Sequence, residues 1–298
     1  MRIVFGTVLA LAVAGTAGAS EPDGAAVFLN HFYVVVDDET YGAAQASGFL
    51  TREFAPFEKR TTTRNDISYT GIYWYGRRTY FELFAPGPQG GPDASGFALG
   101  VERPGESEIV KRAWTAALGG ADGGLVTRKT ETDAVPWFEM SYARAELGGL
   151  RVWLMEYHRD FLAHWYGNLT PARSVTRADV LDRYVARIGP SNERGSALLK
   201  DVTGLTVVLS AADRETLTKL IRAAGWTIRD QPGTLEAVGP ESVLLRLVAE
   251  GDRSPKISEV TFSLQRPVAA QTHRFGSADL RLEGTSARLR FGDPAPGR

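Results

Sequence analysis

Three segments of the chain repeat one order of apolar and polar positions. In the clearest copy, the apolar run 205–209 precedes a stretch, 211–224, whose apolar residues recur at i, i+3, i+4 and i+7. This spacing places apolar side chains on one face of a helix, so it predicts a strand followed by a helix. The other two copies are 29–36 with 39–47 and, more faintly, 96–102 with 107–118.

Short segments with apolar alternation follow each copy and predict strands. They are 67–75 and 79–85 after the first copy, 124–130, 137–143 and 150–157 after the faint copy, and 226–230, 234–238, 242–248, 257–265 and a hairpin over 278–291 after the clearest copy. The predicted fold class is therefore α+β, with tandem βαβββ units that form curved mixed sheets. The charged segment 58–66 is interpreted either as a solvated loop or as an anion clamp at the mouth of a pocket.

Changes in composition along the chain predict the domain boundaries. A polar stretch rich in Pro and Arg separates the two large regions and contains a helical pattern over 177–188. The predicted divisions are a signal peptide at 1–19, a first domain at 26–167, a linker with a helix at 168–200, and a second, shortened domain at 201–292.

The N-terminal residues have the pattern of a secretory signal peptide. Arg2 precedes an apolar run from Ile3 to Ala14, and small residues lead to a cleavage site after Ala19. No later segment has the ~18 uninterrupted apolar residues of a membrane span. We therefore expect a secreted or periplasmic protein that is not embedded in a membrane after signal cleavage.

Composition and charge exclude several classes of function. The 298 residues contain 34 Lys and Arg against 35 Asp and Glu, for a formal charge of −1, and the basic residues form no block. Nucleic acid is therefore not an expected partner, because phosphate binding needs clustered positive charge. The chain contains no Cys, which excludes disulfides, thiolate metal sites and Cys nucleophiles.

Three sequence phrases carry a resemblance to a known group of proteins. They are LNHFYVVV at 29–36, YFELFAP at 80–86 and VWLMEYH at 152–158. With the repeated βαβββ unit, they resemble the vicinal oxygen chelate superfamily, the glyoxalase, bleomycin-resistance and extradiol-dioxygenase group. Within it, the chain resembles a branch of secreted, functionally uncharacterised bacterial proteins. This resemblance implies a glyoxalase-like fold in which two units form a cup.

The resemblance also implies a set of metal ligands at the first and last strands of each unit. By position, His31 and Glu82 fill the places of the first unit, and Glu156 fills the last place of the second. The remaining place falls near Gly96, which has no side chain to coordinate. The implied cofactor is a divalent ion, Zn, Mn, Fe or Ni, with His158 or a water completing the site. The alternative is a buried His–Glu pair, or hydrogen bonds to Tyr hydroxyls, without metal.

Aromatic residues are dense around these positions. Tyr69, Tyr73 and Tyr75 occupy alternate positions of one predicted strand, so their side chains point to the same face. Either they are aromatic core, or they line a pocket for a small molecule. In the second interpretation the substrate-binding residues are Tyr33, Tyr69, Tyr73, Tyr75, Tyr80, Arg64 and His158.

Two functions of different classes remain open from the sequence. The first is a divalent-metal-dependent lyase or isomerase that acts on a small oxygen-rich substrate, with Glu82 or Glu156 as the carboxylate base. The alternative is a non-catalytic secreted protein that binds a small molecule in the same aromatic-lined cup. The second domain lacks the site residues, so we expect it to cover the first domain or to support a homodimer.

Overall fold

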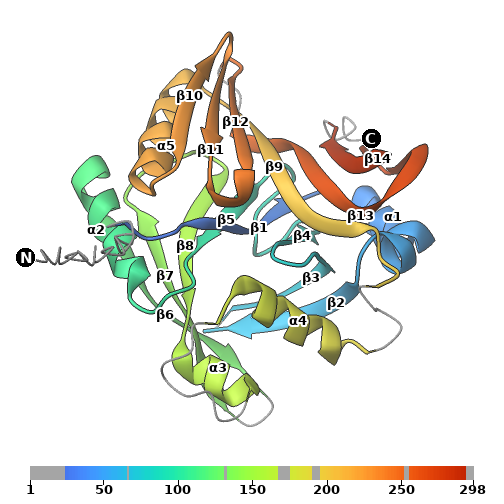
Figure 1. Cartoon of the computed structure of the whole chain (residues 1–298), viewed down its shortest axis with the longest axis horizontal. Coiled ribbons are helices and arrows are strands. Elements are labelled where there is room, and N and C mark those ends of the chain that lie inside the picture. The colour runs from blue at the N-terminus through green and yellow to red at the C-terminus, as the bar shows by residue number, and fades with distance from the viewer. Residues whose placement is uncertain are drawn as a thin grey trace, which may run out of the picture.

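The computed structural model describes residues 24–65, 67–130, 133–166, 175–189, 195–251 and 255–292. The predicted signal peptide lies outside these residues. The described chain forms a mixed α+β structure with a closed eight-stranded barrel and a second, six-stranded sheet (Figure 1). Within the described residues, no helix has the length and apolar character needed to cross a membrane.

The first βαβββ unit builds one half of the barrel. Its elements are β1 (Phe28–Val35), α1 (Asp38–Ala46), a short π-helix (Leu50–Phe54), β2 (Phe57–Arg64), β3 (Ile67–Tyr75) and β4 (Tyr80–Phe84). The Asp37 side chain accepts a hydrogen bond from the Thr40 amide and so caps α1. The helix carries the chain across the sheet, and β4 then pairs with β1 in parallel.

The second unit repeats this order in the other half of the barrel. Its elements are β5 (Ser95–Gly100), α2 (Glu106–Leu118), β6 (Ala121–Lys129), β7 (Ala134–Ala143) and β8 (Leu150–Tyr157). Strand β8 pairs with β5 in parallel, as β4 does with β1. The antiparallel pairs β1–β5 and β2–β6 join the halves, so the strand order around the barrel is β1-β4-β3-β2-β6-β7-β8-β5.

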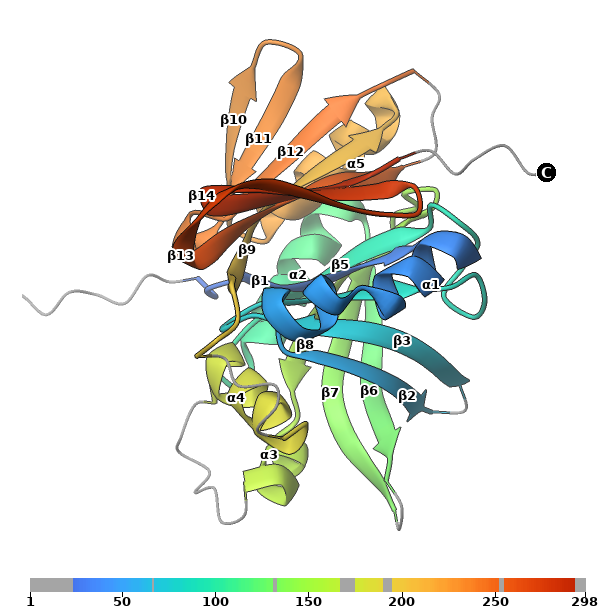
Figure 2. The same cartoon turned by 90° about the vertical axis from the view of Figure 1, so that its right-hand side faces the viewer.

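Two helices pack at one end of the barrel, α3 (Arg159–Tyr166) and α4 (Arg177–Arg187) (Figure 2). Thr176 and Asp179 form a capping box that fixes the start of α4. The buried residues Leu181 and Tyr184 of α4 lie in one hydrophobic cluster with Tyr75 and other side chains from inside the barrel. The segment predicted as a linker therefore contains a helix that is part of the barrel's core.

A third unit forms the second sheet. Its elements are β9 (Leu199–Leu209), α5 (Ala211–Ala223), β10 (Thr227–Gln231), β11 (Thr234–Val238), a 3-10 turn (Pro240–Ser242) and β12 (Leu244–Ala249), followed by β13 (Lys256–Phe275) and β14 (Ala278–Phe291). The order β10-β11-β12-β9 matches that of each barrel half. One hydrophobic core joins this sheet to the barrel, and Trp114 Nε1 of α2 donates to the Leu220 carbonyl of α5 at 3.0 Å.

Two segments differ from the sequence-based expectation. Residues 57–64 form strand β2 and not a loop, because its alternate side chains point inward, where Thr62 is 2% exposed. The last hairpin is formed by β13 and β14, with its turn after Phe275. Gly284 lies inside β14 at a φ of 57°, where the pairing register shifts, and glycine tolerates this conformation without strain.

Candidate functional site

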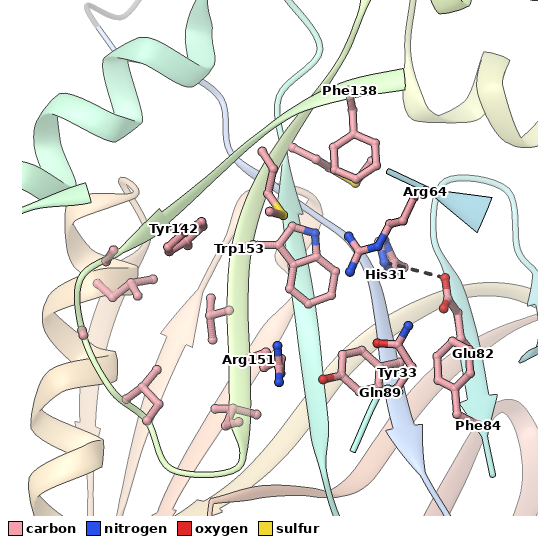
Figure 3. Close-up of a pocket in the computed structure, with 18 of the residues that line it drawn as sticks. His31, Tyr33, Arg64, Glu82, Phe84, Gln89, Phe138, Tyr142, Arg151 and Trp153 are labelled. Atoms are coloured by element: carbon pink, nitrogen blue, oxygen red, sulfur yellow. Dashed lines mark ion pairs between the residues drawn. The ribbon is translucent and has the colours of Figure 1, made fainter. Parts of the chain in front are cut away.

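A cavity of about 680 Å³ opens within the barrel (Figure 3). Side chains alternate between the two faces of a strand, so each barrel strand sends every second residue inward. On β1, His31 and Tyr33 line the cavity, whereas Phe32 and Val34 face the hydrophobic core outside the barrel. The cavity therefore receives its polar groups from positions that the strand pattern fixes.

His31 and Glu82 meet in the wall of the cavity. His31 Nε2 lies 3.8 Å from Glu82 Oε1, and both residues are buried (Figure 3). The Asn30 amide oxygen lies 2.9 Å from His31 Nδ1 and accepts its hydrogen in the corresponding tautomer. Tyr80 stacks on the imidazole with a ring-centroid distance of 4.3 Å. The ring is thus held with its Nε2 lone pair directed toward the carboxyl group.

Burial sets the protonation of this pair. Burial raises the pKa of Glu82 to about 7, against the opposing charges of Arg60 and Arg64. Burial, aided by the positive charges of Arg64 and Arg60, lowers the pKa of His31 to about 3. At neutral pH the imidazole is uncharged, and the carboxyl group exchanges its proton readily. Near neutral pH the pair is therefore an uncharged imidazole beside a carboxyl group that gains and loses its own proton.

The tyrosines fall into two groups. Tyr33, Tyr69 and Tyr80 line the cavity, as the pocket interpretation predicts. Tyr73 and Tyr75 belong to the cluster that packs against α4 and do not line it. The Tyr75 hydroxyl donates to Glu58 at 2.8 Å. Aromatic core and aromatic pocket are therefore both present, on the same strand face but at different depths.

Arg60 and Arg64 are four residues apart on β2, so their side chains point to the same, inward face of the strand. Arg60 donates to the Tyr75 hydroxyl at 3.0 Å and lies 4.2 Å from the centre of the Tyr73 ring. Arg64 lines the cavity, and within the described chain its side chain makes no ion pair or hydrogen bond. Arg64 therefore presents an uncompensated positive charge to the cavity.

Glu156 lies on the opposite face of β8 from the cavity. Its carboxylate accepts hydrogen bonds from the Gly105 amide at 2.8 Å and the Ser107 amide at 3.0 Å. These amides are at the start of α2, where backbone N–H groups lack intrahelical partners. This placement corrects the expected one: the structure does not bring Glu156 together with His31 and Glu82, because Glu156 caps a helix.

The β5–β8 half of the barrel has different residues at the places that correspond to His31 and Glu82. His31 pairs with Tyr80 on β4, and Glu82 is two residues further along. The corresponding pair in the other half is Gly96 with Arg151, and two residues further is Trp153. At the positions where the first half of the barrel has an imidazole and a carboxyl group, the second half therefore has a glycine without a side chain and an indole.

His158 lies outside the cavity lining. It follows β8, and its Nδ1 accepts a hydrogen bond from the Asp160 amide at 3.2 Å, at the beginning of α3. The structure therefore separates His158 from His31 and Glu82, because the strand ends before this residue and the chain turns into the helix.

The donor set does not fit a resident divalent ion. Catalytic zinc sites use three protein ligands, and among the described residues of this cavity only His31 and Glu82 lie together, since Glu146 is on the exposed loop between β7 and β8. Across the described ranges, no three His, Asp or Glu side chains are grouped to hold a metal. The positive charges of Arg60 and Arg64 lie near enough to act on His31 and Glu82, so they would also repel a metal cation held by these two residues. The local field favours an anion.

The cavity lining includes residues that the sequence-based list of site residues omits, and the polar and aromatic ones near His31 and Tyr33 are Gln89, Arg151 and Trp153. Two of them carried a usable signal. Arg151 and Trp153 alternate along β8 on the face opposite to Glu156, so assigning Glu156 to the outer face would have placed both inside. Gln89 lies on the connection between β4 and β5, where no periodic pattern locates a side chain.

Comparison with known proteins places the chain in a family. The sequence model of one family matches residues 29–291, which is most of the chain. The chain belongs to the family of unknown function DUF5829. No curated protein matches the sequence. Membership in this family therefore gives the chain its relatives without assigning an activity.

Solved structures show what the fold is similar to. A hypothetical protein from Staphylococcus aureus has a TM-score of 0.52 at 9% identity, and the match covers 83% of this chain and 95% of that chain. A Mn(II)-bound glyoxalase from Novosphingobium aromaticivorans has a TM-score of 0.45 at 8% identity, covering 88% and 81%. A homoprotocatechuate 2,3-dioxygenase from B. fuscum has a TM-score of 0.44 at 12% identity, covering 91% and 74%. Glyoxalases and extradiol dioxygenases are thus among the structural neighbours.

Proposed function

We propose that this protein is an enzyme that moves a proton on a small molecule held in the barrel cavity, with Glu82 as the acid–base group. The observation that carries the proposal is the buried His31–Glu82 pair in the wall of a cavity of about 680 Å³. The proposal keeps the lyase or isomerase class that the sequence resemblance implies. It assigns the stabilising positive charge to Arg64 instead of a metal ion, because the donor set does not fit a metal.

Glu82 has the properties of a general base at neutral pH. A catalytic base is most effective when its pKa lies near the working pH, and burial raises the pKa of Glu82 to about 7. As the carboxylate, Glu82 takes a proton from the hydroxyl-bearing carbon next to a carbonyl group, and the C–H electron pair moves to give an enediolate. As the acid, it returns that proton to the former carbonyl carbon while the hydroxyl proton passes to the other oxygen, which completes an isomerisation.

His31 positions the carboxyl group and leaves it free to react. Its imidazole is held by Asn30 and by the Tyr80 ring, and its uncharged state adds no positive charge that would hold Glu82 ionised. A charged imidazole would lower the pKa of the neighbouring carboxyl group and so weaken the base. His31 is therefore a positioning residue in this proposal.

Arg64 supplies the charge for the developing oxyanion. The guanidinium lines the same cavity and lies close enough to His31 to lower its pKa. A fixed positive group next to the place where negative charge develops stabilises the transition state without reorganisation. The aromatic rings of Tyr69 and Phe84 also line the cavity and keep bulk water from the reacting groups.

Solvent deuterium exchange tests the proposal without knowledge of the natural substrate. A panel of α-hydroxy ketones and 2-oxo acids is incubated with the protein in D2O, and incorporation at carbon is followed by NMR. We expect exchange with the wild-type chain and with the Glu156→Gln variant, since Glu156 lies outside the cavity. Glu82→Gln should lose at least about a hundredfold in rate. Treatment with a chelator should leave the exchange unchanged.

Two results would overturn the proposal. One is binding of panel compounds in the cavity without any exchange, which would leave the non-catalytic binding protein inferred as the alternative from the sequence. The other is exchange that disappears with the chelator and returns with Zn, Mn, Fe or Ni, which would restore the metal-dependent mechanism.

Export is part of the proposal. The signal-peptide pattern in residues 1–19 predicts a mature chain that begins at Ser20. N-terminal sequencing of protein recovered from the periplasm or the medium checks this, and an uncleaved N-terminus in the cell interior would contradict it. Size-exclusion chromatography of the same sample tests the expected homodimer.

A further inference from the structure

Three neighbouring strands bring Tyr33 and Arg151 together across a glycine. In the register of the barrel, Tyr33 on β1 pairs with Gly96 on β5, and Gly96 pairs with Arg151 on β8. A Cβ at position 96 would lie 2.8 Å from Tyr33 Cε1 and 3.0 Å from Arg151 Cβ. Only glycine leaves room for both neighbours, so the missing side chain is what lets the phenol and the arginine approach each other.

Both polar ends lack a protein partner. Tyr33 is 4% exposed, and its hydroxyl makes no hydrogen bond. Buried hydroxyls nearly always have a partner, so an orphaned one at a cavity wall indicates a group that a ligand satisfies. Among the described residues, the Arg151 side chain has neither an ion-pair nor a hydrogen-bond partner. Figure 3 shows Arg151, Tyr33 and Gln89 on the same side of the cavity.

The charges of this part of the cavity favour an anion. Burial raises the pKa of Tyr33 to about 12 despite the nearby charge of Arg151, so the phenol is a neutral donor. Among the described residues, the carboxyl groups that line the cavity are Glu82, which lies beside the uncharged His31, and Glu146, which is exposed on the loop between β7 and β8. A guanidinium and a phenolic O–H are a donor set for a carboxylate.

The other walls are apolar and aromatic. Phe84, Phe138 and Trp153 line the cavity beyond the Tyr33–Arg151 side. Aromatic rings accept planar apolar groups by stacking and edge contacts. The volume of about 680 Å³ lies within the range of sites for drug-sized ligands. The cavity therefore suits a molecule with one charged end and one apolar body.

We propose that Tyr33 and Arg151 bind the carboxylate of the ligand, and that the substrate class is a small organic monocarboxylic acid with a planar apolar body. Calling this acid a substrate rests on the proposed function. Its binding by Tyr33 and Arg151 does not depend on Glu82. The carboxylate occupies the Gly96 side of the cavity, and the apolar body extends between the aromatic walls toward Glu82 and Arg64.

Isothermal titration with a matched pair of probes tests this inference. The probes are 3-phenylpropanoate and its neutral amide, 3-phenylpropanamide, which differ in charge and little in shape. We expect the carboxylate to bind the wild-type chain at least about tenfold more tightly than the amide, which corresponds to roughly 1.4 kcal/mol. Added salt should weaken the binding of the carboxylate and leave that of the amide unchanged.

Variants locate the binding to the two residues. Arg151→Met keeps the apolar stem and removes the charge, and it should raise the Kd of the carboxylate about tenfold or more while leaving that of the amide within twofold. Tyr33→Phe should raise the Kd of the carboxylate about threefold to tenfold. The matched controls are Arg281→Met on β14, which is exposed and outside the cavity, and Tyr41→Phe on α1, which does not line the cavity. Neither control should change either Kd.

The outcomes separate this inference from the proposed function. Equal affinity for the two probes, no detectable binding of the carboxylate, or Arg151→Met behaving like Arg281→Met would overturn the inference. Glu82→Gln should bind 3-phenylpropanoate as well as the wild-type chain or better, because it removes a like charge. Loss of deuterium exchange in Glu82→Gln with this binding intact would support both, whereas intact binding without exchange in the wild-type chain would overturn the proposed function alone.

Discussion

The two halves of the barrel have the same strand order but different residue types at corresponding positions in the cavity. The β1–β4 half places His31 and Glu82 in the cavity, and the β5–β8 half places Gly96 and Trp153 at the corresponding positions. The half that lacks both ionisable groups instead provides Arg151 and the space beside Tyr33. The repeated fold thus fixes where side chains point, and the residue type at each position decides which chemical group is placed there.

Glu82 and Glu156 show the same contrast within one residue type. Both lie on the last strand of a βαβββ unit, but Glu82 faces the cavity and Glu156 faces the start of α2. One carboxyl group is buried with its pKa raised, and the other accepts two backbone hydrogen bonds. Removing the two charges should therefore change stability in opposite directions.

The largest expected effect comes from Glu82→Gln at alkaline pH. The pKa of Glu82 is raised from 4.5 in the unfolded chain to about 7 in the folded one. As the pH rises through this window the unfolded state loses its proton first, so the wild-type chain becomes less stable. Glutamine carries no charge at any pH. At pH 8 the variant should be more stable than the wild type, on the order of 3 kcal/mol, and the difference should shrink toward pH 4.5.

His31 gives this prediction a second, opposite component. Its pKa is lowered from 6.5 to about 3 in the folded chain. The stability that the neutral imidazole contributes is therefore fully present above pH 6.5 and is lost as the pH falls from 6.5 toward 3. In the wild-type chain the two trends oppose each other between pH 4.5 and 6.5. In Glu82→Gln only the His31 trend remains, and stability should rise with pH. Urea unfolding followed by tryptophan fluorescence measures both, and a pH-independent difference between the chains would contradict the assignment.

A smaller effect is expected at the position that corresponds to His31. Gly96→Ala places a Cβ 2.5 Å from the Arg151 carbonyl oxygen and against the Tyr33 ring, so the strands must shift. Overpacking of this kind costs about 1–3 kcal/mol. Gly124→Ala on β6 is the matched control, because its Cβ would meet no atom within 4 Å. Thermal unfolding of both variants compares them, and equal stability would show that position 96 does not require glycine.

The smallest effect is expected for Glu156→Gln. Glutamine keeps a hydrogen-bond acceptor but removes the negative charge next to the Gly105 and Ser107 amides. The loss should be about 0.5–1 kcal/mol, as for a charge at the start of a helix. Chemical unfolding at pH 7 measures it, with ligand binding in the cavity as the second readout. A loss of binding equal to that of Arg151→Met would place Glu156 at the site and contradict the capping role.

Much of the local structure follows from the sequence because it depends on near neighbours in the chain. The spacing of Leu217, Leu220 and Ile221 predicts α5, and alternation predicts most strands. The segment 57–64 was open to misassignment, because an inward row with Glu58, Arg60 and Arg64 looks like a solvated one in the sequence. Burial inside a barrel is a property of the closed sheet, and the pattern of one strand does not reveal it.

The sequence by itself determined the strand–helix repeats and the alternation within each strand, and its resemblance to the vicinal oxygen chelate superfamily implied that His31 and Glu82 meet, as they do through parallel β1 and β4. Only the tertiary structure decided which face of β8 is the inside, and this one choice moves Glu156 from the cavity to the start of α2. It also decided that Arg151 lies beside Tyr33, since barrel closure sets the register between distant strands. The physical reason is that periodicity defines two faces of a strand, whereas the packing of whole units determines which face is buried against what.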